Sequence, residues 1–168
     1  MSADIRPTHL ADIFRLQEIE RSAAELFRGS SLIDIDAMAV ASLGEHETSI
    51  QQGLSFVAEV EGRIAGFVFG EMHFDDAYLH ELDVDPAFGQ RGIGATLVRK
   101  FVSGARAKGA KAVYLSTFRE PKWNAPFYRK LGFVDVARGD YLRWMSAIEG
   151  EQAKFLDVGT RVFMRLGL

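Results

Sequence analysis

The chain has 168 residues, about the length of one domain, and it is long enough to bury a core without disulfide bonds. Hydrophobic residues make up 48% of it and charged residues 26%, so the composition excludes a disordered chain and a coiled-coil rod. The net charge of −3 disfavours nucleic acid as a partner, and the absence of cysteine excludes disulfide bonds, thiolate metal sites and a cysteine nucleophile.

The first half of the chain predicts a helix followed by antiparallel strands. The pattern predicts Thr8 as a helix N-cap, and apolar residues then recur at helical spacing towards Phe27. Glu61-Gly62 separates two strand-like runs as a tight hairpin turn. The expected strands are 3–6, 56–60, 64–70 and 77–84, with a loop at 73–76, a short helix at 35–43, and a loop or helix end at 45–52.

The second half predicts a helix from Ile93 to a C-terminal glycine, Gly109, and a shorter helix from Ala125 or Pro126 to Lys130. Strands are expected at 112–117, 133–137 and 160–166, and the pattern leaves 139–157 undecided. The early hairpin is antiparallel and the crossover through the helix is parallel. The expected fold class is therefore α/β of the α+β type, a mixed sheet flanked by helices, in one domain over residues 1–168.

A glycine-rich loop between a strand and a helix is the most informative segment. Gly89, Gly92 and Gly94 precede the helix, whose unpaired N–H groups and positive dipole end suit a phosphate or pyrophosphate. Arg91 adds positive charge. A Walker A loop needs Lys-Ser/Thr after its last glycine, and a dinucleotide fingerprint needs glycine where Leu97 stands, so both alternatives fail.

This segment resembles the pyrophosphate-binding motif of the GNAT superfamily of N-acetyltransferases. Leu82-Asp83-Val84 and Gly92-Ile93-Gly94-Ala95 match that motif, whereas its first position, Arg or Gln in the family, is Gly89 here, with Gln90 one place later. A second segment, 123–133, resembles the family's later Asn and Phe-Tyr-x-x-Leu-Gly-Phe pattern. The Asn124-to-Tyr128 spacing is shorter than in the family.

The resemblance implies a mostly antiparallel acyl-CoA N-acyltransferase fold and acetyl-CoA as the acyl donor. It also implies that the sheet splays where the strand 77–84 meets the next strand, and that the pantetheine arm lies there like an extra strand. The main-chain amides of 90–95 are expected to hold the pyrophosphate. The implied cofactor-binding residues are Leu82, Asp83, Val84, Gly89, Gln90, Arg91, Gly92, Ile93, Gly94, Ala95, Asn124, Phe127 and Tyr128.

The implied chemistry needs a proton acceptor for the amine and a proton donor for the leaving thiolate. Tyr128 occupies the family's position for the acid, the alternative being a packed aromatic residue. The candidate bases are His80 and Glu81, followed by His73, and the remaining alternative is that neither His80 nor Glu81 is the base. Because side chains alternate along a strand, His80 and Glu81 are expected on opposite faces.

The resemblance places the acceptor between the first helices and the loops after two strands. The expected lining residues are Phe27, Arg28, His73, Phe74, Phe118, Arg119 and Trp123. Arg28 and Arg119 either favour an amine that carries a carboxylate or are merely solvated. His9 and His46 are expected to be solvated, and the spacing of the four histidines predicts no metal site.

The predicted function is acetyl transfer from acetyl-CoA to a primary amine of a small molecule. Two alternatives stay open: a protein lysine or N-terminal acetyltransferase, and a non-catalytic acyl-CoA-binding module. The partner is then a small-molecule or peptide amine, with no nucleic acid and no membrane, because no apolar run reaches roughly 18 residues. A cytoplasmic location is expected. The oligomeric state is left open, a homodimer included.

Overall fold

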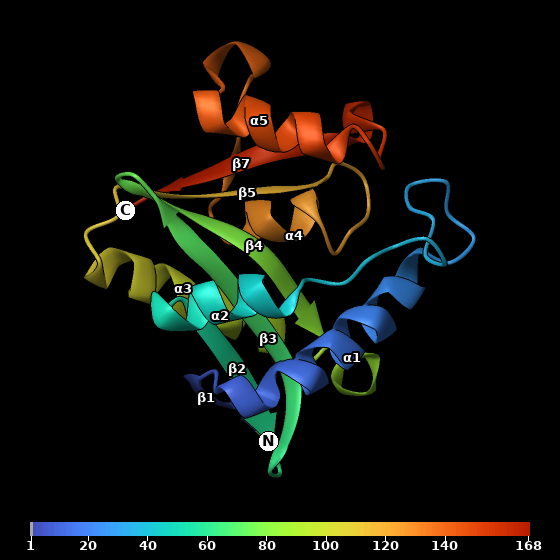
Figure 1. Cartoon of the computed structure of the whole chain (residues 1–168), viewed down its shortest axis with the longest axis vertical. Helices are drawn as coiled ribbons and strands as arrows, with labels where there is room; N and C mark the ends of the chain where they lie inside the picture. The colour runs from blue at the N-terminus through green and yellow to red at the C-terminus, as the bar shows by residue number, and fades with distance from the viewer. Residues whose placement is uncertain (1) are drawn as a thin grey trace.

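A seven-stranded mixed sheet forms the centre of the computed structural model, which describes residues 2–168 (Figure 1). The strand order is β1-β2-β3-β4-β5-β7-β6, and only the β4–β5 pair is parallel. The strands are β1 (Asp4–Pro7), β2 (Ser55–Val60), β3 (Arg63–His73), β4 (Asp76–Val84), β5 (Ala112–Phe118), β6 (Val134–Asp135) and β7 (Arg161–Gly167). The mixed, mostly antiparallel sheet expected from the sequence is therefore confirmed.

Helices cover both faces of this sheet. The α-helices are α1 (Ile13–Ala24), α2 (Leu43–Gln51), α3 (Ile93–Ala107), α4 (Ala125–Lys130) and α5 (Arg143–Gln152). Side chains of α1 pack with β2 and β3, and side chains of α5 pack with β4, β5 and β7. The opposite face of the sheet packs against α3 and α4. Figure 1 shows α1 and α2 in front of β2–β4 and α3 behind them.

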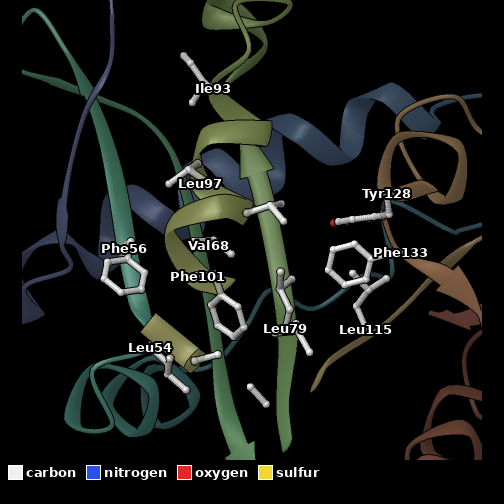
Figure 2. Packing of buried hydrophobic residues seen from close by; sticks show 14 of the residues in the cluster. Leu54, Phe56, Val68, Leu79, Ile93, Leu97, Phe101, Leu115, Tyr128 and Phe133 are labelled. Atoms are coloured by element: carbon white, nitrogen blue, oxygen red, sulfur yellow. The ribbon is translucent and has the colours of Figure 1, made fainter. Parts of the chain in front are cut away.

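The helix α3 is held by the apolar stripe that the sequence predicted. Ile93, Leu97 and Phe101 are buried along one side of it. Figure 2 shows Leu97 and Phe101 directed at the sheet. The close fit requires glycine at residue 70, because a Cβ there would lie 2.1 Å from the carbonyl oxygen of Tyr78 and 2.6 Å from the Phe101 ring.

The hairpin between β2 and β3 also forms as predicted. Glu61 and Gly62 both have positive φ, 51° and 73°. Two left-handed central residues define the turn type whose twist matches that of the flanking strands. The turn therefore fixes the register of β2 against β3.

A β-bulge interrupts β4 beside the predicted catalytic positions. Phe69 pairs with Glu81, whereas the next residue, Gly70, pairs with Leu79. His80 is thus the extra residue on β4, and the alternation of side chains shifts there. The expectation that His80 and Glu81 lie on opposite faces is wrong for this reason, as the site geometry below makes explicit.

The helix expected at 35–43 is wrong. The helix in this region is α2, Leu43–Gln51, where the sequence suggested a loop or helix end. Ser42 caps it: its Oγ accepts a hydrogen bond from Glu45 N (3.3 Å), and Glu45 Oε2 accepts one from Ser42 N (2.7 Å). The Ser-x-x-Glu pattern, which the sequence analysis did not use, was therefore the available signal for this helix.

The undecided segment 139–157 contains the helix α5, which buries Met145 against Tyr78 and Phe163. Among residues 2–168, no helix is long and apolar enough to cross a membrane.

Candidate active site

A cavity opens where β4 and β5 separate. These strands pair only at Ala77 with Val113 and at Tyr78 with Tyr114. Beyond these pairs, the rest of β4 pairs with β3 alone, so its other edge lines the gap. The cavity has a volume of about 740 Å³, and β4, β5, α1, α4 and the glycine-rich loop contribute to its wall. Pockets of roughly 300–1,000 Å³ are typical of small-molecule and cofactor sites.

The glycine-rich loop presents a row of free amides to this cavity. Among residues 2–168, the N–H groups of Gln90 to Ala95 have no hydrogen-bond acceptor. The first hydrogen bond of the helix is donated by the N–H of Thr96 to the carbonyl oxygen of Gly92, at 3.1 Å. Gln90 and Gly92 have positive φ, 60° and 75°. Left-handed residues alternating with ordinary ones turn successive N–H groups into a concavity that suits an anion. The loop therefore presents free amides in a concave backbone, which are the features that suit an anion.

The thirteen residues predicted to bind the cofactor all lie on the wall of this one cavity. They are Leu82, Asp83, Val84, Gly89, Gln90, Arg91, Gly92, Ile93, Gly94, Ala95, Asn124, Phe127 and Tyr128.

Tyr128 lies on α4 and directs its hydroxyl group toward β4 (Figure 2). Its ring packs against Phe127 (centroid distance 5.0 Å) and Phe133 (5.7 Å). Burial raises the pKa of the phenol well above its ordinary value, and the charges of Glu81 and Asp83 raise it further. A tyrosine in this setting stays protonated at neutral pH and is able to donate a proton into the cavity.

Glu81 and His80 lie on the same face of the sheet, the face that α1 and α2 cover. Glu81 pairs in register with Phe69, and directly opposed residues share a face. The His80 ring stacks on the same Phe69 ring, with centroids 5.8 Å apart. Both side chains line the cavity, so the bulge brings both candidate bases to it.

Three carboxyl groups, those of Glu20, Glu81 and Asp83, face this cavity together. Burial raises the pKa of Glu20 to about 8, with a further contribution from the charge of Glu81. Burial also raises the pKa of Glu81 to about 7, although the Arg161 guanidinium opposes the rise. The pKa of Asp83 is raised well above its ordinary value by burial and by the charges of Glu81 and Glu20. The cluster therefore favours an added proton or a bound cation.

Glu20 and Arg161 are site residues that the sequence reasoning missed. Glu20 comes from α1, where both of its carboxylate oxygens accept the N–H of Ala41 at 3.1 and 3.0 Å. Arg161 begins β7, and its Nη2 donates to the carbonyl oxygen (3.0 Å) and Oγ (3.2 Å) of Ser116. Its guanidinium lies 4.5 Å from the Phe118 ring centroid. Neither lies in a motif. A glutamate within the apolar spacing of the first predicted helix was the only available signal.

Asn124 joins α4 to β5 across the cavity wall. Its Nδ2 donates to Thr117 Oγ1 at 3.0 Å, and its main-chain oxygen accepts the N–H groups of Phe127 and Tyr128. Its Oδ1 is buried and has no hydrogen-bond partner among residues 2–168. Asn124 therefore fixes the start of the helix that carries Tyr128.

Three of the predicted acceptor residues line the cavity: Phe27, Phe118 and Trp123. The Phe27 ring lies 5.3 Å from Phe118 and 5.8 Å from Trp123, centroid to centroid. They form an aromatic wall that joins the end of α1 to β5 and the loop after it.

The other four predicted acceptor residues, Arg28, His73, Phe74 and Arg119, lie off the cavity wall. Arg28 is exposed and paired with Glu25 and Asp36. Phe74 is exposed in the β3–β4 turn, and Arg119 donates to the carbonyl oxygen of Gly159. His73 ends β3 and stacks on Trp144 of α5. Of the two alternatives for Arg28 and Arg119, the structure supports the solvated one, because both arginines lie off the cavity wall and contact surface partners.

His46 was expected to be solvated and is instead fully buried on α2. Its ring lies 4.6 Å from the Phe69 ring, and burial lowers its pKa. His9 is exposed, as expected.

Comparisons with known proteins agree with this geometry. Residues 15–133 match the Acetyltransferase (GNAT) family. An uncharacterised N-acetyltransferase of Methanocaldococcus jannaschii is 36% identical over 102 residues, which are 55% of this chain and 45% of that protein. The match thus spans less than half the length of that curated relative.

Solved structures share the fold over nearly the whole chain. The PaiA N-acetyltransferase of Thermoplasma acidophilum, solved with coenzyme A, has a TM-score of 0.74 at 19% identity, with all of both chains covered. Ard1 of Thermoplasma volcanium has a TM-score of 0.72 at 19% identity, covering 100% of this chain and 99% of that one. YncA of Salmonella typhimurium, solved with acetyl-CoA, has a TM-score of 0.66 at 21% identity, covering 100% and 95%. The match over most of its length places this chain in the GNAT family of acetyltransferases.

Proposed function

We propose that the protein transfers the acetyl group of acetyl-CoA to a primary amine of a small cationic molecule. One observation carries the proposal: free amides, an unpaired strand edge, the phenol of Tyr128 and the carboxyl group of Glu81 all line the same cavity. The proposed donor is consistent with two fold neighbours solved with coenzyme A or acetyl-CoA.

The amides of Gln90 to Ala95 are proposed to bind the pyrophosphate of the donor. Each is a free donor at a helix N-terminus, where the dipole adds a positive potential. The unpaired edge of β4 then lies beside the pantetheine arm, whose amides are able to bond as a neighbouring strand does. N–H groups on Leu82–Val84 would polarise the thioester carbonyl as negative charge develops on its oxygen.

Glu81 is proposed as the base, directly or through a water molecule. An alkylammonium ion has a pKa near 10.4, so it must lose a proton before its nitrogen can attack. Glu81 takes this proton. The nitrogen then forms a C–N bond to the carbonyl carbon and the C–S bond breaks, with the thiolate taking the proton of Tyr128. The second proton of the nitrogen restores the Tyr128 phenol through water, and Glu81 returns its proton to solvent.

Tyr128 is proposed as the acid that protonates the departing thiolate. It lines the cavity from α4, opposite the β4 carboxylate, and its phenol is held in the protonated form. His80 also lines the cavity, but its Nε2 lies 3.1 Å from Oε1 of Glu71, a residue that is not on the cavity wall, so this nitrogen is already engaged. These contacts favour Glu81 over His80 as the base.

The acceptor is proposed to be cationic because three carboxyl groups meet on this wall. A bound ammonium group would relieve the repulsion among Glu20, Glu81 and Asp83, and the aromatic wall would contact an alkyl chain. The test is release of free thiol from acetyl-CoA with a panel of polyamines, simple amines, amino acids and peptides. Polyamines are expected to react fastest. Preference for a peptide N-terminus would indicate a protein acceptor, and binding of acetyl-CoA without thiol release would leave a non-catalytic binding module.

A further inference from the structure

A second group of chemically reactive side chains lies beside the cavity, on β3 and β4. Glu71, His73 and His80 each offer one ligand atom, and these atoms lie within 4.8 Å of one another. Glu71 Oε1 is 2.9 Å from His73 Nε2 and 3.1 Å from His80 Nε2. The sequence spacing concealed this group, because only the β3–β4 hairpin brings His80 back to the other two residues.

We propose that Glu71, His73 and His80 bind a divalent transition-metal ion of the Zn²⁺ type. Zinc accepts two imidazole nitrogens and one carboxylate oxygen at about 2.0–2.2 Å, which places tetrahedral ligand atoms about 3.4 Å apart. The two oxygen-to-nitrogen distances here are 2.9 and 3.1 Å, so small side-chain rotations suffice to admit the ion. A water molecule would complete the coordination.

Both imidazole rings are held in place by aromatic neighbours. The His73 ring stacks on Trp144, with centroids 4.9 Å apart and an interplanar angle of 15°. The His80 ring stacks on Phe69 at 13° and meets Tyr78 edge-on at 4.9 Å. Rings fixed in this way lose little freedom when they bind an ion, and this favours binding.

The hydrogen bonding of His73 is incomplete without a ligand. Its Nε2 is buried and has no hydrogen-bond partner of acceptable geometry among residues 2–168, although Glu71 Oε1 is 2.9 Å away. A buried nitrogen left without a partner costs free energy. A metal ion between this nitrogen and the carboxylate would satisfy it, whereas a simple ion pair with Glu71 does not.

There is room beside the group for the remaining ligand. A smaller pocket of about 300 Å³ is lined by Glu71, His80 and Glu45, among others. Glu45 uses Oε2 to accept from the Ser42 N–H and hydroxyl, at 2.7 Å each. Its negative charge would therefore lie near the ion and help to balance it. The group shares His80 with the wall of the larger cavity, but it includes neither Glu81 nor Tyr128, the proposed base and acid.

The test is calorimetric titration of the chelator-treated protein with ZnCl₂, together with the visible absorption of the Co²⁺-substituted protein. We expect one ion per chain and cobalt absorption typical of nitrogen and oxygen ligands. His73→Phe keeps the stack on Trp144 but removes the ligand, and Glu71→Gln removes the charge. Each is expected to weaken binding by more than about tenfold, since losing even an outer partner of a metal ligand costs ~10–100-fold.

His9→Ala is the matched control, because His9 is exposed and outside the group. It is expected to bind Zn²⁺ as the unaltered protein does, and far-UV circular dichroism checks the folding of each variant. Absence of one-to-one binding, or unchanged binding by His73→Phe and Glu71→Gln, would overturn the proposal and leave an ion-pair network only. If His73→Phe does not fold, Glu71→Gln decides.

Discussion

Glu81 and Tyr128 reach the same cavity from two elements, β4 and α4, and their protonation states are linked. Burial raises the pKa of the Tyr128 phenol, and the charge of Glu81 contributes more to this rise than any other charge. A carboxyl group whose pKa is raised to about 7 and a phenol that is protonated at neutral pH therefore face a single space. The following expectations depend on this pairing and on the amides of the neighbouring loop.

Replacement of Tyr128 by phenylalanine removes the acid and keeps the packing of the ring. We expect kcat to fall by roughly 10–10³-fold, at or below the usual contribution of a general acid, with little change in the affinity for acetyl-CoA. Steady-state kinetics and a binding titration measure the two effects. Tyr141→Phe, outside the cavity wall, is the control and should leave kcat unchanged. An unaltered kcat in Tyr128→Phe would remove this residue from the mechanism.

Glu81→Gln and His80→Gln separate the two candidate bases. If Glu81 takes the proton, its replacement lowers kcat/KM by about 10²–10⁴-fold, and that of His80 has the smaller effect. Both variants are assayed for thiol release with the best amine of the panel. The reverse order would transfer the role of base to His80.

The same substitution at Gly92 and at Gly62 tests whether the loop 90–95 binds the pyrophosphate of acetyl-CoA. Gly92 and Gly62 both have positive φ, 75° and 73°, and an added Cβ would meet no atom within 4 Å at either position. Tryptophan therefore strains the backbone equally at both, but only at residue 92 does it enter the cavity. We expect Gly92→Trp to abolish acetyl-CoA binding and Gly62→Trp to retain it. Equal binding by the two variants would count against the cradle.

Glu20→Gln is expected to flatten the pH dependence of stability. The pKa of Glu20 is about 8 in the folded protein, against 4.5 ordinarily, so the folded state binds more protons between these values. Below about pH 4.5, Glu20 therefore does not lower the free energy of unfolding. As the pH rises towards 8, its ionisation lowers that free energy progressively. Glutamine carries no charge and still accepts the Ala41 N–H.

Thermal unfolding at about pH 5 and pH 8.5 measures this effect. The difference between the two pH values should shrink by at least about 1 kcal/mol in Glu20→Gln, which is ~2–4 °C in Tm for a chain of this size. Glu18→Gln, an exposed change on the same helix, is the control. An undiminished pH dependence in Glu20→Gln would mean that this carboxyl group is ionised without penalty in the folded state.

Local patterns predicted the parts of the fold that local physics determines. The Glu61-Gly62 turn, the apolar stripe of α3 and the glycine-rich loop each depend on residues close together in the sequence. All thirteen predicted cofactor residues come to one cavity because two motifs fix the strand, the loop and the α4 segment.

The sequence could not predict features that depend on distant pairing. The bulge at His80 exists only because β3 pairs with β4. It places the side chains of His80 and Glu81 on the same face of the sheet, where simple alternation predicts opposite faces. Arg28 and Arg119 were assigned to the pocket by loop position alone, yet surface partners hold them. Glu20 and Arg161 reach the cavity from opposite ends of the chain, and no spacing rule joins them.

The most direct test of the central claim is a crystal structure of the protein with coenzyme A. We expect pyrophosphate oxygens within about 2.7–3.2 Å of amide nitrogens of Gln90 to Ala95, with the pantetheine arm along β4. A coenzyme bound elsewhere on the molecule, with these amides still lacking an acceptor, would contradict the account.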